Sequence, residues 1–179
     1  MSDAPAVVVV MGVSGSGKSV FGAALAASLD RAFLDADDLH PPANKARMAA
    51  GVPLEDADRW PWLDTVAETG SAAGDVVIAC SALRRAYRDR LRLRLPAAVF
   101  LQLDVAVSEL ERRLAGRSHE FMPASLLTSQ LDLLEPLERD ERGVVLAVEP
   151  GRSIDAMVAE AGSALRDLSA RTTVAPSVD

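Results

Sequence analysis

The chain has 179 residues, 49% of them hydrophobic, which is enough for one well-buried core and short for two domains. Its 19 basic and 26 acidic residues give a net charge of −7, which argues against a general nucleic-acid or membrane-surface binder and favours small partners. One cysteine excludes an intramolecular disulfide, and residues 1–6 lack the charged and apolar regions of a signal peptide. We therefore expect a cytoplasmic protein with a single domain over residues 1–179, no membrane span and no nucleic-acid partner.

Five short apolar runs, rich in Val and Leu and without strict alternation, are typical of buried parallel strands. They are residues 6–11, 32–34, 76–80, 98–103 and 144–148. The segments between them have helical spacing, as in Phe21, Leu25 and Leu29. Strands that alternate with helices predict an α/β fold, here a five-stranded parallel sheet flanked by helices. In such a sheet, ligands bind outside the carboxyl ends of the strands.

The first apolar run leads into a loop that fits the pattern G-x-x-x-x-G-K-[ST], which is typical of a P-loop NTPase. Backbone N–H groups of a glycine-rich loop can surround a polyphosphate, and the following helix directs its positive end at the anion. We expect Lys18 to reach the β- and γ-phosphates and the Ser19 hydroxyl to ligate Mg²⁺. The expected ATP contacts are Gly12, Val13, Ser14, Gly15, Ser16, Gly17, Lys18 and Ser19.

Residues 35–41, Asp-Ala-Asp-Asp-Leu-His-Pro, follow the second expected strand. If the extended backbone continues, Asp35 and Asp37 point the same way, toward the phosphate loop. One of these two carboxylates could then hold hydrated Mg²⁺ while the other takes a proton from an acceptor hydroxyl. A simple role as a helix N-cap stays open for Asp37 and is favoured for Asp38. His40 precedes two prolines on a stiff turn, where it is either a hydrogen-bonding ligand or a surface residue.

The region 44–63 contains a predicted helix start. Asp58 can cap a helix whose first turn tolerates Pro61, because the earliest N–H groups of a helix have no intrahelical partner. Trp60 and Trp62 are interpreted as packing anchors rather than as a stacking platform for a ligand.

Three arginines are candidates for binding an anionic acceptor. Arg47 and Arg59 flank this helix start, and a guanidinium matches a carboxylate bidentately. For these two, an ordinary surface salt bridge is an equally good interpretation. Arg84 is expected in the first turn of the helix after the third strand, where a positive charge opposes the helix dipole and hints at a bound anion.

The third strand ends at Cys80, which we interpret as a small buried hydrophobic residue rather than a nucleophile. Ser81 is the expected N-cap of the next helix. Four later arginines of this helix are predicted to form a solvated face. They are Arg88, Arg90, Arg92 and Arg94.

Residues 113–136 are predicted to form a short helical lid that expels water during phosphoryl transfer. Arg117 is the candidate for neutralising charge on the transferred phosphoryl group, and Arg113 for lying against the adenine. An inert helical hairpin with surface arginines is the alternative. The polar tail, residues 171–179, is expected to fray.

Several of these stretches resemble the bacterial gluconokinase family, over roughly residues 6–150. They are the phosphate loop, Phe-Leu-Asp-x-Asp-x-Leu-His-Pro at 33–41, Pro-Leu…Asp-Arg-x-Pro-Trp-Leu at 53–63, Cys-Ser-Ala-Leu at 80–83, Tyr-Arg-Asp at 87–89 and Leu-Leu-x-Ser-Gln at 126–130. The resemblance implies ATP-dependent phosphorylation of D-gluconate at the 6-hydroxyl. It also implies a nucleoside-monophosphate-kinase-like fold and a homodimer.

By the same resemblance, ATP and Mg²⁺ bind the phosphate loop, and Asp37 orients or deprotonates the acceptor hydroxyl. Arg59 and Arg84 become the preferred clamps on the gluconate carboxylate, with His40 and Arg47 as secondary contacts.

Two other functions stay open. A different small-molecule P-loop kinase, such as shikimate kinase, would keep the phosphate loop and the paired aspartates, but would not be expected to carry the His40-Pro41 or 58–63 motifs. An ATP-dependent switch module would hydrolyse ATP slowly without any acceptor.

Overall fold

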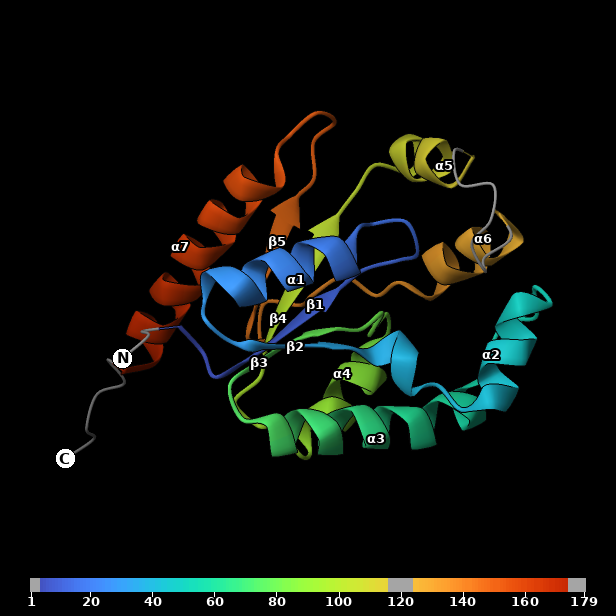
Figure 1. Cartoon of the computed structure of the whole chain (residues 1–179), viewed down its shortest axis with the longest axis horizontal. Helices are drawn as coiled ribbons and strands as arrows, with labels where there is room; N and C mark the ends of the chain where they lie inside the picture. Colours follow the sequence, from blue (N-terminus) through green and yellow to red (C-terminus); the bar gives the residue numbers. More distant parts are fainter. Residues whose placement is uncertain (1–3, 116–123, 174–179) are drawn as a thin grey trace.

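The computed structural model describes residues 4–115 and 124–173, and it has a five-stranded parallel sheet with the order β2-β3-β1-β4-β5 (Figure 1). The strands are β1 Val7–Met11, β2 Ala32–Asp35, β3 Val76–Ala79, β4 Val99–Asp104 and β5 Gly143–Ala147. Each lies within one residue, at either end, of the apolar run that predicted it. The predicted α/β fold with a five-stranded parallel sheet is therefore confirmed.

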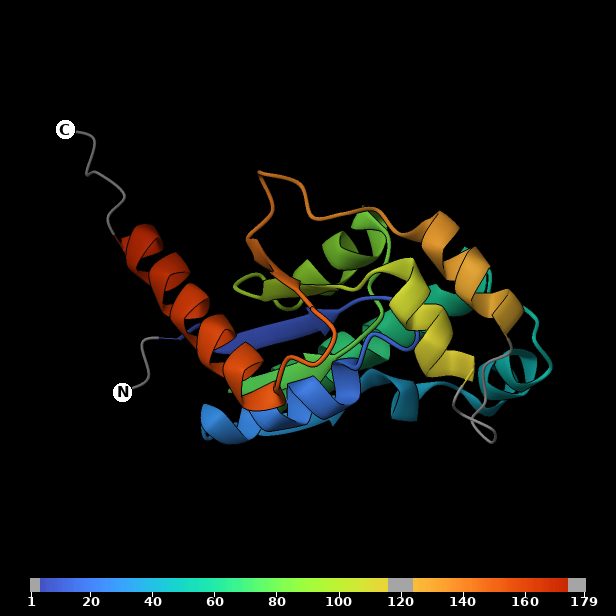
Figure 2. The same cartoon turned by 90° about the horizontal axis from the view of Figure 1, so that it is seen from above.

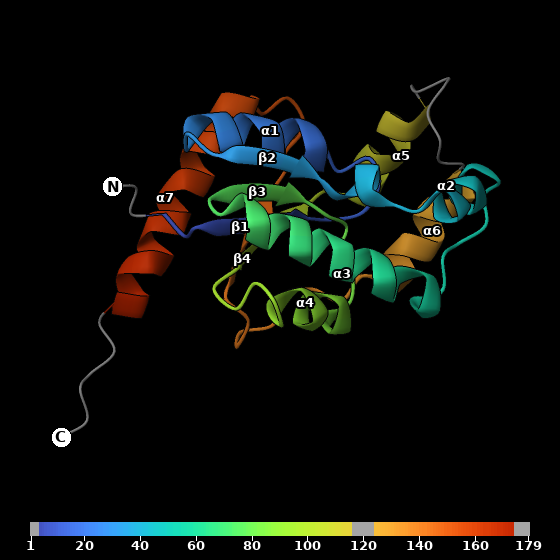
Figure 3. The same cartoon turned by 60° about the horizontal axis from the view of Figure 1, so that its bottom comes forward.

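Helices cover both faces of the sheet. They are α1 Lys18–Ser28, α2 Pro42–Ala49, α3 Asp56–Ala73, α4 Arg85–Arg92, α5 Val107–Ala115, α6 Ala124–Leu133 and α7 Ile154–Thr173, with a short 3₁₀ helix η1 at Ala36–Leu39. Helices α1 and α7 lie on one face, and α3 and α4 on the other (Figure 3). Side chains alternate along a strand. Val8 and Val10 therefore pack against the helices of the α1 and α7 face, and Val9 and Met11 pack against those of the α3 and α4 face.

Burial separates the central strands from the edge strands. All residues of β1 and β3 are buried, as predicted, and so are all of β4 except its last. The prediction is wrong for β2 and β5, where Phe33 is 38% exposed and Val145 is 51% exposed. Both strands lie at an edge of the sheet, with a neighbouring strand on one side only.

Helix α3 begins earlier than predicted. Its N-cap is Glu55, and Asp58 is the third helical residue, whose Oδ2 accepts a 2.8 Å hydrogen bond from the Glu55 N–H. The two residues form a capping box, so the prediction of Asp58 as N-cap is wrong. Pro61 consequently lies inside the helix rather than in its first turn.

Helix α4 begins later than predicted. Arg84 is its N-cap, so the predicted cap, Ser81, is wrong, and Arg84 precedes the first turn. The cap comes instead from a distant residue, because Oε2 of Glu135 accepts a 2.6 Å hydrogen bond from the Arg85 N–H. The sequence around Arg85 does not predict Glu135 as the capping residue, because the two are 50 residues apart.

Arg88 is fully buried, which corrects the prediction that it belongs to a solvated face. Its Nε and Nη2 donate to the two carboxylate oxygens of Glu141 at 2.7 and 2.6 Å. Burial of both charges is offset by this bidentate pair and by further donation from Arg88 to backbone carbonyls, including Leu83 and Glu135. The buried pair thereby fastens the loop after β3 to the segment that follows α6.

Helices α2, α5 and α6 lie beyond the carboxyl ends of the strands, at one end of the molecule (Figure 2). This is the end at which a doubly wound sheet binds ligands. Helix α7 continues to Thr173, so residues 171–173 are helical although they were expected to fray. No helix in the described part of the chain is long and apolar enough to cross a membrane.

Candidate active site

The phosphate loop depends on glycine backbone geometry. Gly12, Gly15 and Gly17 all have positive φ, at 149°, 80° and 92°. A Cβ atom at Gly12 would lie 3.0 Å from Oγ of Ser16 and 3.2 Å from the backbone oxygen of Leu103. The loop is therefore closely packed against the end of β4, and only glycine fits at that position without a shift.

Lys18 opens helix α1 and points back into the loop. Its ammonium donates a 3.1 Å hydrogen bond to the backbone oxygen of Val13. Burial lowers the pKa of Lys18, and the Asp37 and Asp35 carboxylates oppose that change. The charge is held where the loop curves, next to the space that phosphate oxygens would fill.

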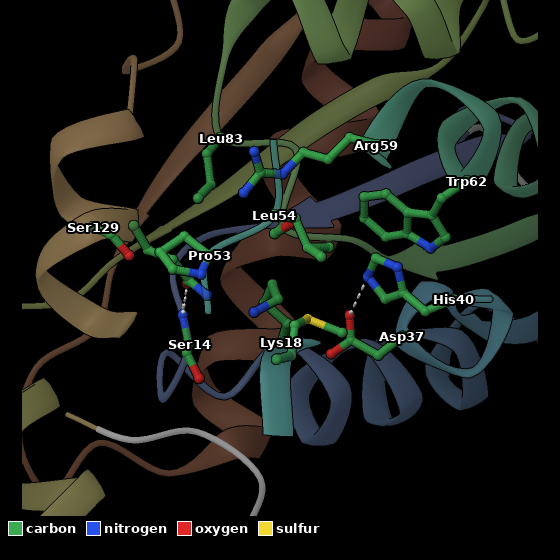
Figure 4. Close-up of a pocket in the computed structure, with 13 residues that line it drawn as sticks. Ser14, Lys18, Asp37, His40, Pro53, Leu54, Arg59, Trp62, Leu83 and Ser129 are labelled. Atoms are coloured by element: carbon green, nitrogen blue, oxygen red, sulfur yellow. Dashed lines mark hydrogen bonds and ion pairs between the residues drawn. The ribbon is translucent and has the colours of Figure 1, made fainter. Parts of the chain in front are cut away.

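The loop also contacts helix α6, at the far end of the predicted lid. The Ser14 N–H donates a 2.6 Å hydrogen bond to Oε1 of Gln130 (Figure 4). Gln130 was not among the predicted site residues. The available signal was the Leu-Leu-x-Ser-Gln motif, in which Gln130 is the last residue.

Arg113 contacts the backbone of the phosphate loop. Its Nη1 is 3.4 Å from the backbone oxygen of Gly15 and 3.3 Å from that of Ser16. Glu109 holds it in place, accepting a 2.7 Å hydrogen bond from Nε. Hydrogen bonds from Arg112 and Arg113 lower the pKa of Glu109 to about 2, so this anchor stays ionised. Contact with adenine remains a prediction for Arg113.

Asp35 and Asp37 are arranged differently from the extended pair that we expected. The backbone turns into η1 directly after Asp35, whose Oδ1 accepts a 3.0 Å hydrogen bond from the Asp37 N–H. Asp35 is therefore the N-cap of η1, and the capping role predicted for Asp38 is wrong. Asp38 lies inside η1, and the N-cap of the following α2 is Pro41.

Asp37 lines a cavity that also contains Lys18 in its wall. Its side chain is 62% exposed. Desolvation raises the pKa of its carboxyl, and the Lys18 ammonium acts in the opposite direction. Because much of this carboxyl still faces solvent, we expect the full increase only when an acceptor fills the cavity. A raised pKa suits a group that accepts a proton.

His40 is buried, with its ring stacked on Trp62 at a centroid distance of 4.0 Å. Asn44 Nδ2 donates to the backbone oxygen of Asp58 at 3.0 Å and lies 3.5 Å from His40 Nδ1. With Nδ1 as an acceptor, the ring proton belongs on Nε2, which lies 3.9 Å from Oδ1 of Asp37. The imidazole therefore directs a donor toward Asp37.

The His40 ring is neutral near pH 7. Burial lowers its pKa to about 4, and the nearby positive charges of Lys45 and Arg59 act in the same direction. Burial also raises the pKa of the Cys80 thiol to about 12, which agrees with its interpretation as an inert core residue. Trp62 is 2% exposed and donates to the backbone oxygen of Ala36, so it is a packing anchor that also borders the cavity.

The three candidate arginines have different surroundings. Arg59 lines the cavity, and its Nη1 donates to the Tyr87 hydroxyl at 3.1 Å. Within the described ranges, Nε and Nη2 of Arg59 have no hydrogen-bond partner. One edge of this guanidinium is therefore available to a ligand.

Arg84 and Arg47 are paired outside the cavity wall. Arg84 donates to Asp56 at 3.1 Å and to Glu135 at 3.4 Å. Arg47 lies 3.3 Å from Oδ2 of Asp58 and donates to a backbone oxygen of the same connection. Either arginine would have to exchange a protein carboxylate for a ligand carboxylate.

One cavity brings several of these groups together (Figure 4). Its polar lining includes Lys18, Asp37, His40 and Arg59. Its apolar lining includes Leu54, Trp62 and Leu83. The arrangement places a phosphate loop, a carboxylate and a guanidinium around one small-molecule space. Arg117 lies outside the described residues.

The chemistry of the expected metal ligands fits Mg²⁺. The described residues contain no group of three or more His, Cys, Asp and Glu that could hold a metal by themselves. Ser19 is exposed at the start of α1, and Asp35 supplies a carboxylate at the end of β2. Mg²⁺ prefers oxygen ligands and is usually held by one or two protein groups together with substrate phosphates and water. The donor set therefore fits an ion that binds together with a nucleotide.

Comparisons with known proteins agree with this geometry. A family model described as an AAA domain matches residues 7–137. The gluconokinase of Gluconobacter oxydans (strain 621H) is 47% identical over 141 residues, covering 76% of this chain and 79% of that protein. A gluconokinase structure from Sinorhizobium meliloti 1021 is 42% identical with a TM-score of 0.85, over 94% of this chain and 96% of that chain. A shikimate kinase structure from Bacteroides thetaiotaomicron, 20% identical with a TM-score of 0.63 over 90% of this chain and 99% of that chain, shares the fold alone.

Proposed function

This chain belongs to the gluconokinase family of P-loop kinases, and we propose that its cavity holds D-gluconate while the γ-phosphoryl group of ATP moves to the 6-hydroxyl. The products are 6-phospho-D-gluconate and ADP. The observation that carries this proposal is that Lys18, Asp37 and Arg59 line the same cavity. They supply a phosphate contact, a proton acceptor and a carboxylate ligand.

The reaction is an in-line displacement. The 6-hydroxyl oxygen forms a bond to the γ-phosphorus as the bond to the β,γ-bridging oxygen breaks, and that oxygen leaves as part of ADP. Asp37 accepts the hydroxyl proton, and Lys18 stabilises negative charge on the phosphoryl oxygens. Positioning and electrostatic stabilisation supply most of the acceleration, because the protein forms no covalent bond to the substrate.

The acceptor is oriented by its two ends. The free Nε–Nη2 edge of Arg59 receives the gluconate carboxylate bidentately. Leu54 and Leu83 pack against the carbon chain between the ends. His40, neutral and with a proton on Nε2, donates a hydrogen bond to an acceptor hydroxyl beside Asp37, whose Oδ1 lies 3.9 Å from Nε2. Arg47 is proposed as a secondary contact, as the resemblance implies. Arg84, which the resemblance implies as a preferred clamp, is also proposed only as a secondary contact, because it is already paired with a carboxylate of the protein, as Arg47 is.

The remaining parts of the proposal concern ATP and its metal. The phosphate loop, residues 12–19, holds the phosphates, and Ser19 and Asp35 would hold Mg²⁺, which neutralises phosphate charge when bound. Arg113 lies close enough to the loop to cover the nucleotide. Arg117 is proposed as the arginine that stabilises the transferred group, on the sequence alone.

We also propose one P-loop kinase domain over residues 1–179, a homodimer and a cytoplasmic location. The domain is supported by the length of the chain, and the dimer by the family resemblance. The location is supported by the single buried cysteine, Cys80. Small-molecule partners, rather than nucleic acid or membrane, agree with the net charge of −7.

An acceptor panel tests the function. ADP release is measured with Mg²⁺ and ATP in the presence of D-gluconate, other sugar acids, glucose or shikimate, and without acceptor. We expect turnover that requires D-gluconate and is lost with glucose, which has no carboxylate. Turnover with shikimate instead would indicate a different small-molecule kinase. Equal slow release without acceptor would indicate an ATP-dependent switch.

A further inference from the structure

A buried tyrosine stands between the cavity arginine and a nearby carboxylate. Tyr87, in α4, is 2% exposed, and its hydroxyl lies 2.5 Å from Oδ1 of Asp56. Nη1 of Arg59 lies 3.1 Å from the same hydroxyl. The direct distance from Arg59 Nη1 to that Asp56 oxygen is 4.0 Å. The hydroxyl is thus the closer partner of both charged groups.

The donors and acceptors fit together in one way. A carboxylate can only accept and a guanidinium can only donate, whereas a phenol hydroxyl has one proton and lone pairs. Tyr87 must therefore give its proton to Asp56 and accept from Arg59. Burial and the hydrogen bond to Asp56 raise the pKa of the Tyr87 phenol, which keeps it neutral at physiological pH.

This chain of bonds decides which edge of Arg59 is free. Nη1 is directed at Tyr87, which leaves Nε and Nη2 as the edge that has no partner among the described residues. Figure 4 shows the Arg59 guanidinium in the space near Leu83 and Leu54. That edge matches the two oxygens of a carboxylate.

Without the hydroxyl, Arg59 would have a different partner. Asp56 is already 3.1 Å from Nη1 of Arg84, which in turn pairs with Glu135. A guanidinium 4.0 Å from a carboxylate would move into direct contact with it, because the hydroxyl that accepts from Nη1 would be absent. Arg59 would turn away from the acceptor and toward Asp56.

We propose that Tyr87 is a positioning residue for the acceptor, which acts through its hydroxyl by holding Arg59 in the cavity and out of direct contact with Asp56. The inference rests on the proposed function, because it concerns how the same carboxylate is recognised. Tyr87 itself does not line the cavity, so its effect passes through Arg59.

The test is Tyr87→Phe, which removes the hydroxyl and keeps the buried ring. We expect the KM for D-gluconate to rise about tenfold, with kcat and the KM for ATP within about twofold. The matched control is Trp60→Phe, because Trp60 packs edge-on against the Tyr87 ring at 5.4 Å and this change leaves the hydroxyl in place. It should leave the KM for D-gluconate within about twofold.

A double-mutant cycle with Arg59→Ala shows whether the effect passes through Arg59. In the Arg59→Ala background, Tyr87→Phe should no longer change the KM for D-gluconate. The inference is overturned if Tyr87→Phe leaves the KM unchanged, if its effect persists without Arg59, or if Trp60→Phe has the same effect. Absence of D-gluconate turnover in the wild-type protein would instead contradict the proposed function.

Discussion

The Oε1 atom of Gln130 accepts a 2.6 Å hydrogen bond from the backbone N–H of Ser14, which joins helix α6 to the phosphate loop. Backbone N–H groups of this loop are the donors that hold phosphate oxygens. The amide oxygen of Gln130 therefore occupies a donor that a nucleotide would use. A phosphate that binds Ser14 must displace Gln130, and α6 lines the acceptor cavity as well.

We expect Gln130→Ala to bind ATP about fivefold more tightly in the absence of acceptor, because a competing hydrogen bond of about 1 kcal/mol is removed. Isothermal titration of the nucleotide into each protein measures this. Thr128→Ala, which changes an exposed side chain of the same helix, is the control and should bind as the wild type does. Weaker binding by Gln130→Ala would mean that the amide assists the nucleotide.

We expect Arg59→Ala to raise the KM for D-gluconate by about tenfold to a hundredfold, because a charge-assisted bidentate contact is lost. The kcat should change much less, since Arg59 is proposed to bind the carboxylate and not the reacting phosphoryl group. Steady-state kinetics give both constants. Arg94→Ala, an exposed arginine paired with Glu68, is the control. An unchanged KM for Arg59→Ala would exclude this assignment.

His40 is expected to titrate near pH 4 rather than near its ordinary value of 6.5. Because its pKa is lower in the folded state, protonation favours unfolding, and this group decreases stability as the pH falls from 6.5 toward 4. NMR titration of the ring measures the midpoint. The chain has two histidines, so a His119→Gln variant assigns the signal. A midpoint near 6.5 would contradict the burial argument.

The buried Arg88–Glu141 pair is expected to stabilise the loop beside the cavity. Arg88→Met should decrease the free energy of unfolding by about 3–5 kcal/mol at pH 7, because it leaves Glu141 buried without its main partner. Denaturant unfolding measures the difference. Glu141→Gln, which keeps the shape, should cost less.

The pH dependence of this pair has a definite sign. Burial alone would raise the pKa of Glu141, but hydrogen bonds from Arg88, the Glu138 backbone and Arg92 outweigh it and lower the pKa to about 2. Because the pKa of Glu141 is lower in the folded state, this group stabilises the fold at pH values above its ordinary pKa of 4.5. The contribution is lost as the pH falls from 4.5 toward 2. The difference between wild type and Arg88→Met should therefore shrink over that range. A constant difference would mean that the pair does not contribute as described.

The strands and the phosphate loop could be predicted because their signals are local. An uninterrupted apolar run such as Val7–Met11 identifies a strand wherever it lies in the sheet. Local signals do not say which strand is at an edge, so the exposure of Phe33 was not predictable. The burial of Arg88 was missed for the same reason, because its partner Glu141 is 53 residues away.

The site could be predicted only in part. Lys18, Asp37, His40 and Arg59 line one cavity because each lies in a first helical turn or a short connection at the carboxyl end of the sheet. Tyr87 and Gln130 were not predicted as site residues, since their roles depend on contacts 28 and 116 residues apart. The cap of α4 was missed for a related reason, because Glu135 caps this helix from a distant segment.

The central claim is that the protein phosphorylates D-gluconate bound in this cavity. The most direct test is ³¹P NMR of a reaction that contains equal amounts of ATP and D-gluconate. We predict that ADP and a phosphate monoester of D-gluconate appear in equal amounts, without free phosphate. Lys18→Ala should abolish product formation, because the loop loses the ammonium that is proposed to stabilise the transferred group. Inorganic phosphate in place of the monoester, at a rate that does not depend on D-gluconate, would contradict the account.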